Sequence, residues 1–173
     1  MKGIFQLKIV GLSFLIISMI YCVTTTVFGQ TTWNVPGDGS DTCTVVNSNC
    51  STIQGAINAA TSGDTINVAA GNYPENLTLG KSLTLEGAQA GVDACGRAAN
   101  ESVIATSGTL LTLQTGSADS IIDGFTFSGG SLQITSSTGP IDNLQIMNNR
   151  FIGFTGNAVF LNDSGVDITI SQN

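Results

Sequence analysis

Apolar residues change their spacing once along the chain, between residues 60 and 65. Before that point, Ile53, Ala56, Ile57 and Ala60 lie at positions i, i+3, i+4 and i+7, which puts them on one face of a helix. From Thr65 onward apolar and polar residues alternate in short runs, the pattern of half-buried strands. The pattern predicts one short helix followed by ten strands: TINVAA, ENLTL, SLTLEG, SVIA, LLTLQT, IIDGFTF, SLQIT, NLQIMNNRF, AVFL and DITIS.

Local signals mark both ends of the predicted helix, which we place over residues 51–60. Ser51 is a good N-cap, and Gln54 three residues later completes a capping box, so that two amide groups at the helix start are satisfied locally. Gly63 and Asp64 follow the last apolar position and predict the end of the helix. The helix therefore has defined ends and one apolar face to bury.

The strands of the second half of the chain repeat every 24 residues. The residues in register are Ser120, Leu144 and Ile168; Ile122, Ile146 and Ile170; Phe127 and Phe151; and Asn148 and Gln172. An antiparallel sandwich would explain the alternation but not the fixed period, whereas a parallel β-helix explains both. We therefore predict an all-β parallel β-helix over residues 51–173, with the helix covering its N-terminal end and about four coils behind it.

Several segments resemble a known family. The order TIQGAINAA, DTINVAAGNYPENLTL, SLTLEGA and ESVI resembles the N-terminal cap and first coil of right-handed parallel β-helix proteins of the pectin-lyase-like superfamily. IIDGFTFSGG and LQIMNNRFIGF are similar to their later coils. The resemblance covers about Thr52 to Asn173, and it rests on turn glycines and inward apolar residues. It therefore implies the fold more specifically than any one activity.

The family contains enzymes, and the resemblance implies what their sites would need. In the resembled lyases acidic residues hold calcium against a uronate and an Arg or Lys abstracts a proton; in the resembled esterases two Asp and one Arg act. Here Arg97 and Arg150 are the only arginines, and no tight group of Asp accompanies either. Catalytic residues are therefore unknown, and whether the chain belongs to an enzyme is uncertain, with the balance against catalysis in residues 1–173.

The first 29 residues predict a secretory signal peptide. Lys2 and Lys8 precede an apolar run, Ile9 to Val23, that is short for a membrane span, and Val27 and Gly29 provide small residues at a cleavage site. The alternative is a retained membrane anchor. We expect cleavage, a mature chain starting at residue 30, and a secreted or cell-surface protein with no membrane association after cleavage.

The segment ahead of the helix, residues 30–50, contains an expected strand and an expected disulfide. Trp33 and Val35 predict a short edge strand before a Pro-Gly-Asp-Gly turn. Cys43 and Cys50 are the natural pair in a compartment that permits disulfides. Their closed loop would constrain the unfolded chain by about 2 to 3 kcal/mol and hold the segment that enters the helix.

Net charge narrows the classes of partner. Residues 30–173 contain three basic and twelve acidic residues, a formal charge of −9. Nucleic acids and anionic membrane surfaces need clustered Lys and Arg, so we expect neither as a partner. The same negative charge argues weakly against tight binding of polyanionic sugars.

Groups that could hold a metal or a cofactor are sparse. The chain has no histidine and no cluster with metal-ligand spacing, and the Asp38 to Asp41 turn lacks the spacing and the terminal acidic ligand of a calcium loop. We expect no cofactor and no metal site. Cys95 has no obvious partner; it is either a buried small residue, which we favour, or pairs with a group beyond this sequence.

The remaining polar residues are interpreted as structural. Asp123, Asp142 and Asp167 are expected to be solvated surface carboxylates, and the long connection from Gly87 to Asn100, with Asp93 and Arg97, to be a plain loop projecting between two strands. Asn148 and Asn149, in register with Gln172 and Asn173, are expected to stack their amides from coil to coil as a ladder that stabilises the fold.

Two functions remain. The first is a non-catalytic β-helix module that binds a polysaccharide, a cell-surface glycan or a neighbouring surface molecule. The alternative is the N-terminal fragment of a carbohydrate-active enzyme, lyase-like or pectinesterase-like, with its catalytic coils downstream. Val166 to Ser171 begins a strand in register with its predecessors without a closing cap, so we expect further coils beyond Asn173. The sequence does not define the glycan or the oligomeric state.

Overall fold

A computed structural model describes residues 29–36, 43, 48–97, 100–130, 132–136, 139, 141–162, 165 and 167–173. Most of the predicted signal peptide and the Asp38 to Asp41 turn lie outside these residues, so both interpretations stay predictions. Within the described ranges, no helix has the length and apolar character needed to cross a membrane.

The described residues form one α-helix, α2 (Ile53–Ala59), a single 3₁₀ turn (Thr115–Ser117) and three sheets in which every strand pairing is parallel. Sheet A contains β1 (Thr32–Val35), β2 (Thr65–Val68), β5 (Thr84–Glu86), β8 (Ile121–Asp123), β11 (Gln145–Met147) and β14 (Thr169–Ser171). Sheet B contains β3 (Gly71–Tyr73), β6 (Ser102–Ala105), β9 (Phe125–Ser128) and β12 (Arg150–Ile152). Sheet C contains β4 (Leu77–Leu79), β7 (Thr109–Leu113), β10 (Leu132–Ser136) and β13 (Val159–Phe160).

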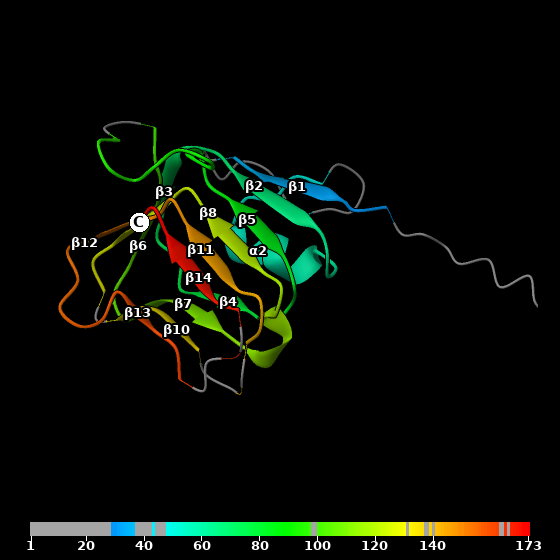
Figure 1. Cartoon of the computed structure of the whole chain (residues 1–173). Helices are drawn as coiled ribbons and strands as arrows, with labels where there is room; N and C mark the ends of the chain where they lie inside the picture. The colour runs from blue at the N-terminus through cyan, green and yellow to red at the C-terminus, as the bar shows by residue number, and fades with distance from the viewer. Residues whose placement is uncertain are drawn as a thin grey trace, which may run out of the picture.

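The chain visits the three sheets in a fixed order. From β2 to β13 it passes through sheets A, B and C four times, and β14 returns to sheet A. In Figure 1 the strands of sheet A lie side by side in chain order, from blue β1 to red β14. This arrangement is consistent with the predicted parallel β-helix. It also confirms the edge strand predicted around Trp33, since β1 is an end strand of sheet A.

The core is built from side chains stacked on neighbouring strands. In sheet A, Ile66, Leu85, Ile122 and Ile146 follow one another in register and are almost completely buried. Each such side chain contributes about 1.5 to 3 kcal/mol through burial. The phenyl rings of Phe127 and Phe151 in sheet B stack with centroids 5.4 Å apart, as their 24-residue spacing predicts.

The 24-residue period also sets the backbone conformation of the turns. Asp119, Asn143 and Asp167 have positive φ angles of 59°, 53° and 58°, and Gly124, Asn148 and Gln172 have φ of 80°, 55° and 55°. Asn, Asp and Gly adopt this left-handed conformation more readily than other residues, and Gly without steric cost. The repeat is therefore a repeat of turn geometry as well as of apolar positions.

The start of α2 differs from the prediction. Thr52, not Ser51, is the N-cap, and its side chain accepts a hydrogen bond from the amide of Gly55. The carboxylate of Glu75 accepts the amide hydrogens of Ile53 and Gln54, at 3.0 and 2.9 Å. Because this acceptor comes from a distant part of the chain, the capping box between Ser51 and Gln54 is not needed and does not form.

The amide of Gln54 instead joins α2 to sheet C. Its side-chain oxygen accepts the amide hydrogen of Thr78 at 2.7 Å, and its nitrogen donates to the Thr78 carbonyl at 3.2 Å. At the other end, the ammonium of Lys81 donates to the carbonyls of Ile57, Asn58 and Ala60. The apolar face of α2 packs toward β1, β2 and β4, so both ends and one face of the helix are held by the first strands.

The outer edge of β1 is covered by the segment that precedes α2. Asn34 donates its amide hydrogen to the carbonyl of Ser48 and accepts that of Cys50, both at 2.8 Å. Cys50 forms the predicted disulfide with Cys43. An open strand edge would otherwise present unpaired backbone groups, so this segment, held by the disulfide, closes that side of sheet A.

Cys95 is not buried, contrary to our prediction. It lies in the connection between β5 and β6, outside the three sheets, and its side chain is exposed. The neighbouring Ala94 takes the buried position instead, with 7% of its surface exposed. The disulfide between Cys43 and Cys50 is compatible with an extracellular protein.

Candidate functional site: a polar row on the outer face of sheet A

Polar side chains form one row across the N-terminal half of the outer face of sheet A. Asn34 on β1 is the register partner of Asn67 on β2, and Asn67 is the partner of Glu86 on β5. Asn49 extends the row on the other side through an isolated parallel bridge to Asn34. We call these four residues the amide row.

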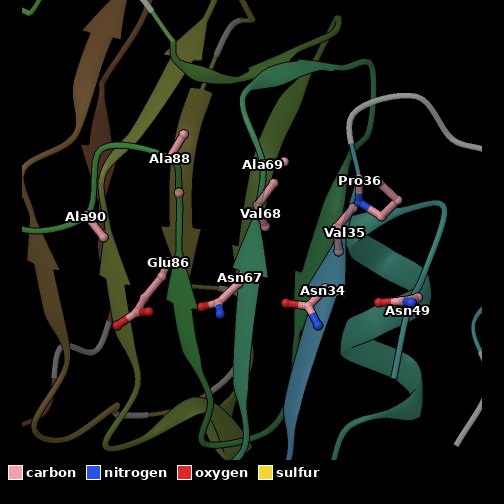
Figure 2. A pocket seen from close by; sticks show the side chains of 11 residues that line it. Asn34, Val35, Pro36, Asn49, Asn67, Val68, Ala69, Glu86, Ala88 and Ala90 are labelled. Atoms are coloured by element: carbon pink, nitrogen blue, oxygen red, sulfur yellow. The ribbon is translucent and has the colours of Figure 1, made fainter. Parts of the chain in front are cut away.

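The amide row borders a hollow of about 410 Å³. Figure 2 shows the side chains of Asn34, Asn67 and Glu86 in line across three neighbouring strands, with Asn49 continuing the line. The other residues that line the hollow are small or apolar: Val35, Pro36, Val68, Ala69, Gly87, Ala88 and Ala90. The site is therefore a shallow groove with hydrogen-bonding groups along one side and apolar surface along the other.

One wall of the groove belongs to the long connection after β5. Ala88 and Ala90 line the hollow, and the next residue, Gly91, donates its amide hydrogen to both carboxylate oxygens of Asp123 at 3.1 Å. The connection crosses β8–β9 at Gly124, where a Cβ atom would collide with the backbone of Ala90. This close approach fixes the wall against the sheet.

Arg97 anchors the far end of the same connection. Its guanidinium donates to the carbonyls of Gln89, Val92 and Phe125 at 3.2 to 3.3 Å, and its side chain is only 3% exposed. The carboxylate of Glu101 lies 3.3 Å from Nε of Arg97 and 3.7 Å from Nη1 of Arg150. We had expected this connection to project from the sheets as a plain loop. The contacts of Arg97 instead hold it against the sheets.

Charged groups near Arg97 shift the pKa of its guanidinium in opposite directions. Burial lowers the pKa of the Arg97 guanidinium, the carboxylate of Glu101 raises it, and the positive charge of Arg150 lowers it again. The net change is downward, but an arginine titrates so far above neutral pH that Arg97 stays charged. Because this guanidinium is buried and bonded to three carbonyls, we assign it to holding the connection and not to abstracting a proton.

The carboxylates that we expected to be solvated behave differently from one another. Asp142 and Asp167 are exposed, as predicted. Asp123 is not a simply solvated group, because its carboxylate accepts hydrogen bonds from the Gly91 amide and from the Asn148 side chain. The reason is that the connection after β5 folds back over β8, which the sequence spacing did not indicate.

The predicted asparagine ladder forms between Asn149 and Asn173, whereas the side chain of Asn148 donates to Asp123. Asn149 is fully buried; it donates to the carbonyls of Ile122 and Met147 and accepts the amide hydrogen of Phe125. Asn173, 24 residues later, donates to the carbonyl of Ile146 and accepts from Asn149. These amides satisfy backbone groups between successive strands, so they stabilise the fold and are not available to a ligand.

The amide row was not identified from the sequence. Asn34, Asn67, Glu86 and Asp123 are successive register partners, but they are 33, 19 and 37 residues apart. The first turns of the chain therefore lack the fixed period that exposes equivalent positions in the second half. The only available signal was the alternation within each strand, in which Asn34 and Asn67 each precede an inward valine.

Comparison of the chain with protein-family models, with curated proteins and with solved structures gave no match. The fold and the groove therefore have to be interpreted from their own geometry.

The chemistry of the groove suits a ligand rich in hydroxyl groups. A carboxamide offers two donor hydrogens and an acceptor oxygen, and a carboxylate offers acceptors only. Hydroxyl groups can both donate and accept, so the side chains of Asn34, Asn67 and Glu86 can bond several hydroxyls of one molecule. The apolar wall can pack against the carbon face of such a ligand.

Proposed function

We propose that the chain forms a right-handed parallel β-helix of the pectin-lyase-like type over residues 51–173, with α2 as its N-terminal cap. Three observations support the proposal: all strand pairings are parallel, the chain visits three sheets in one order, and equivalent residues pair at a 24-residue period. Crossovers between parallel strands of one sheet are right-handed in nearly all proteins, which supports the handedness.

We further propose that the protein is a secreted or cell-surface module that binds a glycan in the groove beside the amide row. The observation that carries this function is the register of Asn34, Asn67 and Glu86 on three adjacent strands bordering one hollow. Because neighbouring strands lie about 4.8 Å apart, the row spaces its hydrogen-bonding groups regularly along the direction in which the strands of sheet A pair. An extended chain of sugars lying along that direction would meet one polar group per strand.

Calorimetric titration with oligosaccharides tests the function. The double variant Asn34→Ala with Asn67→Ala removes two of the amides and should weaken binding about fivefold or more, because each hydrogen bond lost contributes about 0.5 to 1.5 kcal/mol. Asn72→Ala is the matched control, since Asn72 is an exposed strand asparagine on sheet B.

Loss of binding in the double variant with normal binding in Asn72→Ala would support the groove as the site. Equal binding by the wild type and the double variant would place the glycan elsewhere. Failure of a broad panel of oligosaccharides to bind the full chain would overturn the proposed function itself. The enzyme alternative stays a prediction, because it depends on residues that the amide row does not contain.

A further inference from the structure

The amide row ends in a negative charge that nothing nearby neutralises in the described part of the chain. Glu86 is half-buried at the end of the row, and the ion pairs formed by the described residues both involve Glu101 and not Glu86. None of the described residues that line the hollow is a lysine or an arginine. A ligand at this end of the groove therefore meets a carboxylate without a counter-ion from the protein.

The basic residues of the described chain are engaged elsewhere. Lys81 binds three carbonyls at the end of α2, and Arg97 and Arg150 lie beside Glu101. On β8 the register partner of Glu86 is Asp123, but Asp123 does not line the hollow. Its carboxylate is already bonded to the Gly91 amide and the Asn148 side chain, so Glu86 is the carboxylate that a ligand in the groove meets.

We infer that the groove selects glycans that carry free amino groups, with an ammonium group of the ligand beside Glu86 and its hydroxyls along Asn34 and Asn67. This inference rests on the proposed function and narrows its ligand. An ammonium group has three donor hydrogens and no acceptor, and its positive charge complements the carboxylate of Glu86. A uronate would bring a second negative charge beside Glu86 and is disfavoured.

Two sugars that differ only in acetylation test the inference. Glucosamine oligomers carry an ammonium group on each unit, whereas N-acetylglucosamine oligomers of the same length have a neutral amide there. We would titrate both into the full chain at mildly acidic pH and low ionic strength. The glucosamine oligomer should bind about threefold to fivefold more tightly, the factor that corresponds to one partly exposed ion pair, and the difference should shrink as salt is added.

Two charge variants test whether Glu86 causes the preference for the glucosamine oligomer. Glu86→Gln keeps the size and most of the hydrogen bonding of the side chain and should make the two oligomers bind equally. Asp167→Asn removes the same charge from an exposed turn outside the row and should preserve the preference. A preference that survives Glu86→Gln, or that Asp167→Asn reduces as much, would overturn the inference, because attraction to the net charge would then explain it.

The outcomes separate the inference from the function on which it rests. Equal binding of both oligomers, weakened by Asn34→Ala with Asn67→Ala, would leave the glycan-binding function in place and overturn the amino-sugar preference. No binding of either oligomer, together with no binding of other oligosaccharides, would overturn both.

Discussion

The indole Nε1 of Trp33 donates a hydrogen bond of 3.0 Å to the carboxylate of Asp64, which joins β1 to the turn before β2. The same carboxylate accepts the amide hydrogens of Thr31 and Thr61 and the hydroxyl of Thr61, and Asp64 is 3% exposed. One buried carboxylate therefore holds an end strand of sheet A and the chain that leaves α2.

The stabilisation by Asp64 depends on pH. Burial raises the pKa of this carboxyl, but hydrogen bonds from Thr61, Trp33 and Thr31 outweigh burial and leave the pKa below its usual value. A group whose pKa is lower in the folded state stabilises the protein fully above its unfolded pKa, about 3.9, and loses that contribution as the pH falls through the folded pKa. Stability should therefore decline as the pH falls below about 4.

Asp64→Asn tests this linkage. The variant should lose about 2 to 3 kcal/mol at neutral pH, because an amide nitrogen would face donor groups, and it should lose less further stability under acid than the wild type. Urea unfolding at several pH values, followed by the fluorescence of Trp33, the only tryptophan, measures both effects. Parallel pH profiles for the two proteins would contradict the assignment.

Lys81→Met should destabilise the protein by about 1 to 2 kcal/mol. The ammonium of Lys81 is bonded to three carbonyls at the last turn of α2, and that turn has no basic residue of its own. A positive charge at the C-terminal end of a helix also interacts favourably with the helix dipole. Thermal and urea unfolding measure the change. Lys81→Arg retains the charge and should recover part of the loss; if Lys81→Met unfolds like the wild type, the contact contributes nothing.

Gly124→Ala should be far more damaging than Gly153→Ala. Both glycines have positive φ, of 80° and 67°, so an added Cβ strains both backbones by about 1 kcal/mol. Only at Gly124 would the Cβ also collide with the backbone of Gln89 and Ala90; at Gly153 the nearest atom is 3.5 Å away. We expect Gly124→Ala to cost about 1 to 3 kcal/mol more and to reduce glycan binding. Equal stability of the two variants would show that the connection moves away easily.

Asn149→Ala should cost about 3 kcal/mol, because it leaves the amide of Phe125 and the carbonyls of Ile122 and Met147 without their buried partner. Asn72→Ala, at an exposed strand position, should change stability by less than about 0.5 kcal/mol. Urea unfolding compares the two. A small effect at Asn149 would mean that water replaces the amide.

Periodic features were predictable because they depend on local patterns that recur. The pairing of Ile122, Ile146 and Ile170 and the stacking of Phe127 on Phe151 follow from one fixed spacing. The helix followed from its apolar stripe, and the disulfide from the short loop that it closes. In each case the residues involved are near neighbours in sequence or one period apart.

Non-local contacts were not predictable. The acceptor for the first amides of α2 is Glu75, more than 20 residues downstream, and no local signal at Ser51 or Thr52 reveals it. The burial of Arg97 and the hydrogen bonds to Asp123 depend on a connection that folds back over the sheet. The amide row depends on turns of unequal length in the first half of the chain, where register cannot be counted from the sequence.

The repeat of turn geometry has a consequence for how such a chain changes in evolution. In the second half, several left-handed positions, inward residues and the ladder asparagine recur after 24 residues, and β8, β11 and β14 pair with one another at that spacing. A tandem duplication of one such unit would insert a new layer whose upper and lower surfaces already match their neighbours. The length of this protein is therefore a trait that duplication and deletion can adjust in whole units, while the helix end and the amide row remain as they are.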